Sequence, residues 1–593
     1  MREVCRTYKL IEKIGGKNKM SPRFLWKEFF IMGRRHLSKN GFLTVFLLIF
    51  IFLSFTCAAD EKSDKVDRLF APWDKPDTPG CAVAVVQKGK IIHKRGYGMA
   101  NLEHSIPITP QSVFYIGSVS KQFVAMCIAQ LVKEGRLSLD DNISKHVPEM
   151  PDYGDPVTVR HLIHHTSGLR DYLTLLNIAG IDFGTYHMDD VLELISRQKE
   201  LNFKPGEEFL YSNSGYFLLA VIVERVSGLS LREYAQRNIF KDLGMKYSHF
   251  HDDYTTVIKN RASGYIPGDK GEFKNFISTF DCVGSGGLFT SVEDLILWDQ
   301  NFYHYKVGGK DVIDLMHVRG KLNNGKELDY AFALSRGQHK GLETVSHGGA
   351  LGGYRSYLLR FPGQEFSVII LSNLSIFNPG ELAYQVADIY LSGRFKQEGE
   401  VRPGGEIQFI DLPTKMLKEK VGLYMDRNTG AIREIHLRGG SLVLEGFGQR
   451  FRLAAVSESV FRIREEPDRM VIEFEEQSKG KPMLLYILAE GLKPETYEAV
   501  YPIAPLSKQL KGYTGDYESQ ELQVTFRLAV REGKLYFVHK SAPLQPLRFM
   551  VKDQFAVENL QIRFIRDEEG SVVGFKLDAG RVKNLHFDRR QLD

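Results

Sequence analysis

Residues 114–135 read FYIGSVSKQFVAMCIAQLVKEG, the most informative segment of this 593-residue chain. Ser118 and Lys121 are three residues apart at the start of a predicted amphipathic helix, so their side chains share one face. The partial positive charge at a helix N-terminus stabilises negative charge that develops on such a serine. A desolvated lysine one turn along can remove the hydroxyl proton and make the serine nucleophilic. The pair predicts an activated serine, although alone it also fits a capped helix with a solvated lysine.

Two later segments add the rest of a pattern. Residues 205–228, PGEEFLYSNSGYFLLAVIVERVSG, place Tyr211-Ser212-Asn213 directly before an apolar helix pattern. Residues 345–361, VSHGGALGGYRSYLLRF, place His347-Gly348-Gly349 ahead of a strand pattern. Ser-x-x-Lys, Tyr-x-Asn and cationic residue-x-Gly, in this order, resemble the motifs of the serine β-lactamase and penicillin-binding-protein superfamily.

This resemblance extends over roughly residues 65–390. The Tyr-Ser-Asn element resembles the class C branch of the superfamily rather than class A. Three flanking segments also resemble the family: HLIHHTSGLRDY (161–172), NIFKDLGMKYSHF (238–250) and GSGGLFTSVEDLILWDQ (284–300).

The resemblance implies a catalytic group of four side chains. Ser118 would be the acylated nucleophile, and Lys121 and Tyr211 would share its proton, with Tyr211 as base or acid near the leaving group. Asn213 would orient both the substrate and Lys121. The alternative for Tyr211 is a buried aromatic side chain without a catalytic role.

The resemblance also implies the walls of the site. His347 and Gly349 would line the wall opposite the nucleophile, on an edge strand, and the alternative for His347 is a strand-capping histidine. The backbone N–H groups of Ser118 and Ala350 would form an oxyanion hole. No metal and no organic cofactor are implied.

The sequence around these motifs predicts one catalytic domain over residues 60–393. Residues 81–98 read as a β-hairpin, and strand patterns return at 354–360 and 366–373 before a helical stretch that ends at about 393. Strands at both ends of a largely helical middle indicate one sheet built from both ends. We therefore expect an α/β (α+β) β-lactamase/transpeptidase-like domain with a helical lobe.

After a Gly/Pro-bearing linker at 394–409, the sequence changes to short strand patterns of alternating residues with frequent turns. The segment LKEKVGLYMD at 417–426 aligns with LKGYTGDYES at 510–519, and the same spacing joins Leu442 to Leu535. Such a repeat predicts two copies of one unit, at 410–500 and 501–593, each a small antiparallel β-barrel. These barrels show no cluster of catalytic residue types, so we expect them to tune access, dimer formation or attachment rather than chemistry.

The N-terminal residues 1–59 resemble an export leader. They hold 11 Lys/Arg against 3 Asp/Glu, and residues 41–59 carry no charge at all. A positive flank, an apolar run and small residues at Cys57 and Ala59 predict a cleaved signal, with an uncleaved membrane anchor as the alternative. A start at Met32 would give a leader of ordinary length, so residues 1–31 are a candidate for a misassigned start.

Charge and cysteine content exclude other classes of protein. The 534 residues after the leader carry a net charge of −3, which does not fit a nucleic-acid binder. Cys81, Cys127 and Cys282 lack metal-like spacing, and buried free thiols are expected.

The spacing of His161, His164 and His165 could suit a metal on a helix, but the resemblance makes this segment a structural turn. Arg355 could bind a substrate carboxylate or form an ion pair at the strand edge.

Together these observations predict an exported, periplasmic or extracellular serine hydrolase, similar in domain arrangement to D-aminopeptidases. Its substrates would be small peptides of D-amino acid or D-Ala-D-Ala type, or esters. The alternatives are a non-catalytic binding or scaffold protein of the same fold and a true β-lactamase. The sequence does not indicate an oligomeric state.

Overall fold

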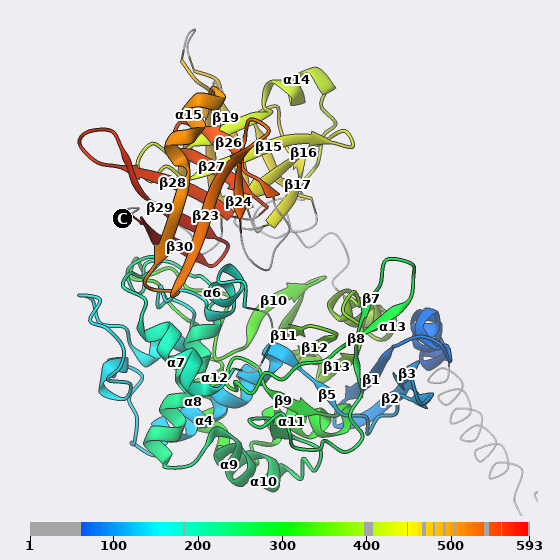
Figure 1. Ribbon diagram of the computed structural model, residues 1–593. Coiled ribbons are helices and arrows are strands. Elements are labelled where there is room, and N and C mark those ends of the chain that lie inside the picture. Colours follow the sequence, from blue (N-terminus) through cyan, green and yellow to red (C-terminus); the bar gives the residue numbers. More distant parts are fainter. Residues whose placement is uncertain are drawn as a thin grey trace, which may run out of the picture. The chain divides into compact units, whose positions relative to one another are not determined.

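The computed structural model describes residues 61–593 except 182–183, 185, 396–406, 447–448, 465–469, 478–480, 490–493, 503–504, 539–544, 559 and 591–593. The predicted leader 1–59, with its possible start and cleavage sites, and most of the predicted linker therefore lie outside the described residues. The chain divides into two compact units, Met1–Leu69 and Phe70–Asp593. In the first unit the described residues, 61–69, are helical. The second unit contains the catalytic domain and both C-terminal β-domains (Figure 1).

A six-stranded antiparallel sheet, in the order β10-β11-β12-β13-β1-β2, forms the framework of the catalytic domain. Its strands are β1 Cys81–Gln87, β2 Lys90–Tyr97, β10 Ser335–His339, β11 Leu342–Leu351, β12 Tyr354–Phe361 and β13 Phe366–Ser372. The pairing of β1 with β13 confirms that both ends of the domain build one sheet.

Helices cover both faces of this sheet, which explains why β1 and β13 are mostly apolar and are buried except at Gln87. Ser367 of β13 donates a hydrogen bond to Asp299 of α11 (Val292–His304). The next residue back, Phe366, packs its ring against Tyr390 of α13 (Pro379–Leu391). Successive strand residues point to opposite faces, so α11 and α13 lie on opposite sides of the sheet.

The helical middle of the domain forms a second lobe around α4 and α8, whose inward residues are fully buried (Figure 1). α4 packs on α8 and α12, and α8 packs on α5. The helices of the domain are α4 Lys121–Lys133, α5 Val159–Ile163, α6 Tyr172–Ile178, α7 Met188–Ser196, α8 Asn213–Ser227, α9 Leu231–Ala235, α10 Lys241–Leu243, α11, α12 Gly309–Met316 and α13. Short strands connect them: β3 Met99–Asn101, β4 Ile106–Pro107, β5 Phe114–Tyr115, β6 His249–Phe250, β7 Gly264–Pro267, β8 Phe273–Phe276 and β9 Leu288–Thr290.

The first C-terminal β-domain is a closed antiparallel barrel with its own apolar core. Helix α14 (Thr414–Glu419) precedes its strands, which are β14 Gly422–Met425, β15 Ile432–Arg438, β16 Ser441–Gly446, β17 Gln449–Ala455, β18 Val460–Ile463, β19 Met470–Glu475, β20 Leu484–Ala489 and β21 Glu495–Val500.

The second β-domain is a nine-stranded antiparallel sheet with β25 and β26 at its two ends. Only Leu547 separates these two end strands in the chain, so the sheet curls into a barrel-like form. Helix α15 (Ser507–Leu510) precedes its strands, which are β22 Gly515–Ser519, β23 Val524–Arg531, β24 Lys534–Val538, β25 Gln545–Pro546, β26 Arg548–Val551, β27 Gln554–Val557, β28 Leu560–Arg566, β29 Val572–Ala579 and β30 Val582–Arg589. Unlike the first barrel, this domain shares one cluster of buried apolar side chains with the catalytic domain.

The internal repeat is visible in a shared hydrogen bond. The Tyr424 hydroxyl donates to the Lys420 carbonyl at 2.9 Å in the first β-domain. The Tyr517 hydroxyl donates to the Tyr513 carbonyl, also at 2.9 Å, in the second. Each tyrosine thus ties the start of its first strand to the helical turn before it, at corresponding positions of the repeat.

The three cysteines beyond the leader are buried free thiols, as expected. Among the described residues no single helix is long and apolar enough to cross a membrane, although Asn213–Ser227 and Leu231–Leu243, bent by 76°, satisfy the same criterion as a pair.

Candidate active site

Ser118 and Lys121 meet at the junction of a 3-10 turn and helix α4. The turn, η2, covers Gly117–Ser120, and the α-helix begins only at Lys121. Residues three apart eclipse one another in a 3-10 turn. Nζ of Lys121 consequently lies 3.1 Å from the Ser118 hydroxyl oxygen.

The surroundings of Lys121 favour its neutral form. Its side chain is fully buried, and this burial lowers its pKa well below the usual range. The charge of Asp171 opposes the shift, and that of Arg581 adds to it. Nζ is 2.9 Å from the Asn213 side-chain oxygen and 2.5 Å from the Ser285 carbonyl. A neutral amine has two N–H donors, so these two acceptors leave its lone pair for the Ser118 proton.

Asp171 fixes the orientation of Asn213. Asp171 caps helix α6, and its Oδ2 accepts hydrogen bonds from the Asn213 backbone N–H at 2.7 Å and side-chain Nδ2 at 2.8 Å. Because Nδ2 is held in this way, Oδ1 faces Lys121. Asn213 is the first residue of α8, which places Tyr211 just before the helix.

The Tyr211 hydroxyl is buried and has no hydrogen-bond partner of normal geometry among the described residues. Burial raises the pKa of this phenol, while interactions with Ser118 and with the charge of Arg581 lower it in part. The Tyr211 ring also lies near two basic side chains: its centroid is 5.0 Å from Nζ of Lys121 and 4.8 Å from the guanidinium carbon of Arg581. An unsatisfied buried hydroxyl is costly and rare, and a reacting group of a substrate would supply its partner.

His347 lies near the end of a chain of hydrogen bonds in which each group donates to the next. The Ser212 N–H donates to Nδ1 of His165, so Nε2 of His165 is the donor to the Tyr330 hydroxyl at 3.2 Å. The Tyr330 hydroxyl then donates to Nε2 of His347 at 3.0 Å, and Nδ1 of His347 donates to the Gly348 carbonyl at 2.7 Å. Each histidine is neutral in this arrangement.

The pKa shifts agree with neutral histidines. Burial, together with the charge of Lys121, lowers the pKa of His347 to about 4. The same two causes, in the same order, lower the pKa of His165 well below its usual value. His347 lies on the predicted wall, but both its ring nitrogens are occupied and it carries no charge at neutral pH.

The edge of β11 lies directly against the turn that carries Ser118. Strand β10 pairs with β11 only from Leu342 to Ser346, which leaves the edge beyond it open to η2. A methyl group on Gly349 would lie 2.0 Å from the Ile116 carbonyl oxygen, and one on Gly117 would lie 2.5 Å from the Ala350 nitrogen. This close approach requires glycine at both positions. It also brings together the two segments whose N–H groups, on Ser118 and Ala350, are the predicted oxyanion hole.

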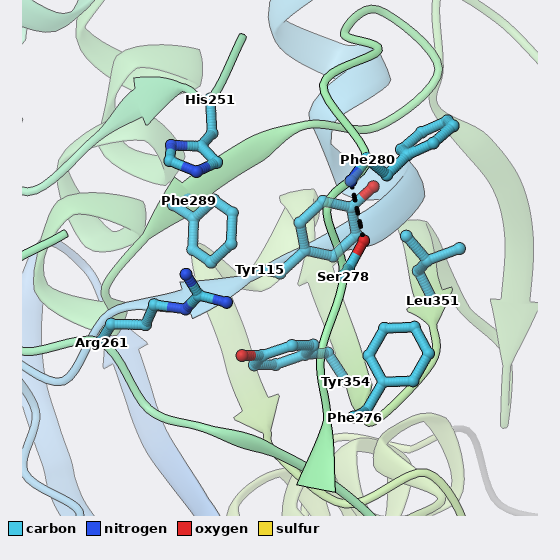
Figure 2. Close-up of a pocket in the computed structure, with 9 residues that line it drawn as sticks. All are labelled: Tyr115, His251, Arg261, Phe276, Ser278, Phe280, Phe289, Leu351 and Tyr354. Carbon is cyan, nitrogen blue, oxygen red and sulfur yellow. Dashed lines mark hydrogen bonds between the residues drawn. The ribbon is translucent and has the colours of Figure 1, made fainter. Parts of the chain in front are cut away.

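An aromatic hollow lies next to this edge, lined by residues that include Tyr115, Leu351, Tyr354 and Phe289 (Figure 2). The guanidinium of Arg261 reaches into it and lies 5.4 Å from the centre of the Phe289 ring. The hollow holds only about 20 Å³ of space for water-sized groups, which is enough for a water but too little for a substrate side chain.

The site also contains a residue that the sequence did not predict. Arg581, in the turn between β29 and β30 of the second β-domain, lies with its guanidinium carbon 4.8 Å from the Tyr211 ring centroid. Its Nη1 is 3.8 Å from Oδ2 of Asp171. The β-domains were expected to tune access, dimer formation or attachment rather than chemistry, and this turn brings a side chain of the second β-domain next to Tyr211. A two-residue Gly-Arg hairpin turn has no catalytic signature, so only the folded chain shows its position.

The remaining candidates have structural partners. His161 caps α5, His164 contacts the carbonyls of Arg160 and Val318, and His165 belongs to the Tyr330 chain. Arg355 donates to the carbonyls of Gly352 and Tyr354 rather than to a carboxylate. The three histidines thus point to separate partners.

Comparisons with known proteins agree with this geometry. The family model described as Beta-lactamase matches residues 66–390, more than half of the chain, so the chain belongs to the beta-lactamase family of serine hydrolases. The fold is that of a β-lactamase-like catalytic domain followed by antiparallel barrel-like domains, as the sequence predicted.

Individual relatives include both penicillin-binding proteins and D-aminopeptidases. The chain is 29% identical to penicillin-binding protein 4* of Bacillus subtilis, over 68% of this chain and 92% of that protein. It is 25% identical to a D-aminopeptidase of Brucella canis, over 86% of this chain and 96% of that protein. Among solved structures, the octameric penicillin-binding protein homologue from Pyrococcus abyssi shares the fold, with a TM-score of 0.51, 23% identity and coverage of 82% of this chain and 99% of that one.

Proposed function

We propose that the protein hydrolyses amide or ester bonds of small D-aminoacyl peptides, amides and esters through an acyl-enzyme on Ser118. One observation carries this proposal. A fully buried Lys121 with a lowered pKa lies 3.1 Å from the Ser118 oxygen, and the nearby Tyr211 hydroxyl has no hydrogen-bond partner of normal geometry in the described part of the chain. A nucleophile within hydrogen-bond reach of a base, with that base positioned by other groups, is the arrangement that covalent catalysis needs.

In the first step the lone pair of Lys121 accepts the Ser118 proton while the serine oxygen attacks the substrate carbonyl carbon. The resulting oxyanion accepts hydrogen bonds from the N–H groups of Ser118 and Ala350. When the carbon–nitrogen or carbon–oxygen bond breaks, Tyr211 gives its proton to the leaving group and regains one from Lys121. Water then attacks the acyl carbon while the same groups accept its proton, and they return this proton to the Ser118 oxygen as the acyl bond breaks and the acid product leaves.

The substrate class rests on the relatives and on the third motif. D-aminopeptidases of Gluconobacter oxydans and Brucella canis are 26% and 25% identical to this chain. The positions where a β-lactamase has Lys-Thr-Gly or Lys-Ser-Gly are occupied by a neutral His347 and by Gly348, which has no hydroxyl. A charged hydrogen bond contributes about 1.5–3 kcal/mol, so its loss here disfavours β-lactams.

The test is a substrate panel measured with the wild type and Ser118→Ala. It contains D-amino acid p-nitroanilides, D-Ala-D-Ala peptides, short-chain p-nitrophenyl esters and nitrocefin. We expect Ser118-dependent hydrolysis of at least one D-aminoacyl substrate or ester, with a kcat/KM above that for nitrocefin. A nitrocefin kcat/KM above every other value would contradict the substrate assignment.

Export is part of the same proposal. It is supported by the charge-free segment 41–59 and the basic residues before it. N-terminal sequencing of the protein from a host culture tests it: a new N-terminus near residue 60 in the exported fraction supports export, and retention of the whole chain in the cytoplasm contradicts it.

A further inference from the structure

The turn that carries Arg581 is rigidly placed. Gly580 and Arg581 are the two residues between the paired ends of β29 and β30, and Gly580 has a φ of +51°, which suits a tight hairpin turn with glycine first. The Arg581 carbonyl accepts hydrogen bonds from the Asp171 N–H at 3.3 Å and the Asn202 side chain at 2.9 Å. The Asn202 side chain in turn accepts from the Lys583 N–H at 2.7 Å.

A buried arginine of the catalytic domain holds the same hairpin from the other side. Arg170, whose side chain is fully buried, donates to the carbonyls of Lys583 at 3.0 Å and Asn584 at 2.9 Å. Its third partner is Glu521 of the same β-domain, at 2.6 Å. The backbone of the turn is thus fixed by both polar side chains and main-chain groups.

The guanidinium of Arg581, in contrast, contacts the Tyr211 ring and lies near Asp171 without a hydrogen bond to any described residue. Its side chain is 43% exposed, and its nearest carboxylate oxygen, on Asp171, is 3.8 Å away. That carboxylate already accepts hydrogen bonds from both nitrogens of Asn213 and from Thr174. Among the residues that the structure describes, none accepts a hydrogen bond from this guanidinium, which has five N–H donors in a fork that matches a carboxylate.

The position of this free donor group matches the leaving group of a peptide. Tyr211 is the proposed proton donor to the leaving nitrogen, and Arg581 lies against the ring of that same tyrosine. In a C-terminal amino acid the carboxylate carbon is about 2.5 Å from the nitrogen, by standard bond lengths and angles. A leaving amino acid next to the Tyr211 hydroxyl therefore places its carboxylate close to Arg581.

We propose that Arg581 binds the carboxylate of the substrate's leaving residue, so that the second β-domain makes the enzyme selective for acyl donors with a free C-terminal carboxylate. This inference rests on the proposed function and specifies its substrate. The wall that binds carboxylate in β-lactamases carries a neutral His347 and Gly348 here. Arg581 supplies the missing positive charge from another domain and from the opposite end of the chain.

The test compares two substrates that differ only in this charge: N-acyl-D-Ala-D-Ala and its C-terminal amide. The variants are Arg581→Gln and Arg581→Lys. The control is Lys583→Ala, which removes another cation of the same hairpin and keeps the backbone hydrogen bonds of the turn. The Lys583 side chain is 41% exposed, and its Nζ lies 3.5 Å from a carboxylate oxygen of Glu208. We expect Arg581→Gln to lower kcat/KM for the acid about tenfold to a hundredfold. The amide should change less than threefold, Arg581→Lys should lose less than Arg581→Gln, and the control should match the wild type.

An equal loss for both substrates, or an upward shift of the pH profile with no difference between them, would overturn the proposal in favour of an effect on Tyr211 or Lys121. No loss for either would overturn it as well.

A binding measurement covers the case in which neither peptide is turned over. N-acetyl-D-alanine and N-acetyl-D-alaninamide compete with a fluorophosphonate for Ser118, and labelling is followed by intact mass. We expect the acid to protect the wild type at a concentration at least tenfold lower than the amide, and Arg581→Gln to remove this difference. Equal protection by acid and amide in the wild type would overturn the Arg581 proposal alone, whereas an unlabelled Ser118 would overturn the proposed function and this inference with it.

Discussion

Replacing Tyr211 with phenylalanine should lower activity without lowering stability. The Tyr211 hydroxyl is buried without a hydrogen-bond partner among the described residues. A buried hydroxyl in this state costs about 1–3 kcal/mol of stability, because it has lost water and its interaction with Ser118 lacks normal hydrogen-bond geometry. Tyr211→Phe removes this cost and keeps the ring that packs against His165, 4.1 Å away between centroids. The free energy of unfolding should therefore stay constant or rise, by up to about 2 kcal/mol.

The same substitution should greatly reduce turnover. The phenol is the proposed proton donor to the leaving group, and a positioned acid–base group typically contributes about 10²–10⁴-fold to the rate. We expect kcat/KM for an amide substrate to fall by that range. Esters should lose less, because an alkoxide or phenolate leaves with less help from a proton.

The assay combines steady-state kinetics with denaturant unfolding. The control is Tyr265→Phe, another buried tyrosine of the catalytic domain, whose hydroxyl accepts a hydrogen bond from the Leu102 N–H at 2.8 Å. Its removal leaves that donor unpaired, so stability should fall by about 1–3 kcal/mol while activity is retained. The two changes are thus expected to differ in both measurements: Tyr211→Phe should lose activity and keep stability, and Tyr265→Phe should lose stability and keep activity.

One result would refute this reasoning. If Tyr211→Phe kept more than a tenth of the amide kcat/KM while losing stability like the control, its hydroxyl would be a structural group with a partner, not a catalytic one.

Three further predictions concern the base, the strand edge and the contact between domains. Because Lys121 must be neutral to accept a proton and its pKa lies well below 10.5, kcat/KM should rise with pH and level off well below that value; a rise that continues to pH 10.5 would contradict a desolvated lysine. Gly349→Ala should lower the free energy of unfolding by about 1–3 kcal/mol and kcat/KM at least tenfold, since its methyl group would lie 2.0 Å from a carbonyl oxygen. Gly348→Ala should change both quantities less, because the nearest contact of its methyl group is 3.3 Å from a tyrosine ring. Arg170→Ala should lower the free energy of unfolding by about 3–5 kcal/mol because it removes the cation that pairs with the buried Glu521. Arg527→Ala, which breaks an ion pair whose arginine is 65% exposed, should lower it far less; equal losses would show that the buried pair has no special role.

Local patterns in the sequence predicted the framework of the catalytic domain well. The hairpin at 81–98 and the strands near 354–373 follow from apolar runs and turn residues, and the structure joins them in one sheet. The repeat in the C-terminal part also predicted two related β-units. Their difference, one closed barrel and one curled nine-stranded sheet, depends on packing that alternation of residues does not encode.

Contacts between distant segments could not be predicted where a partner lies outside the three motifs. Lys121 bonds to the Ser285 carbonyl across 164 residues, and a main-chain acceptor leaves no mark on residue type. The chain from His165 through Tyr330 to His347 needs three side chains from three segments, of which only His347 lay in a motif. Arg581 reaches the site through docking of a whole domain, held by bonds that span up to 414 residues.

The most direct test of the central claim is the identity of the acylated residue. The wild type and Ser118→Ala are treated with a fluorophosphonate and, separately, with a slow ester substrate, and the adducts are located by intact mass and peptide mapping. We expect one adduct per wild-type chain on Ser118, and none on Ser118→Ala, whose melting temperature should match that of the wild type. An adduct on the folded Ser118→Ala variant, or a wild type that turns over substrate without any adduct on Ser118, would contradict it.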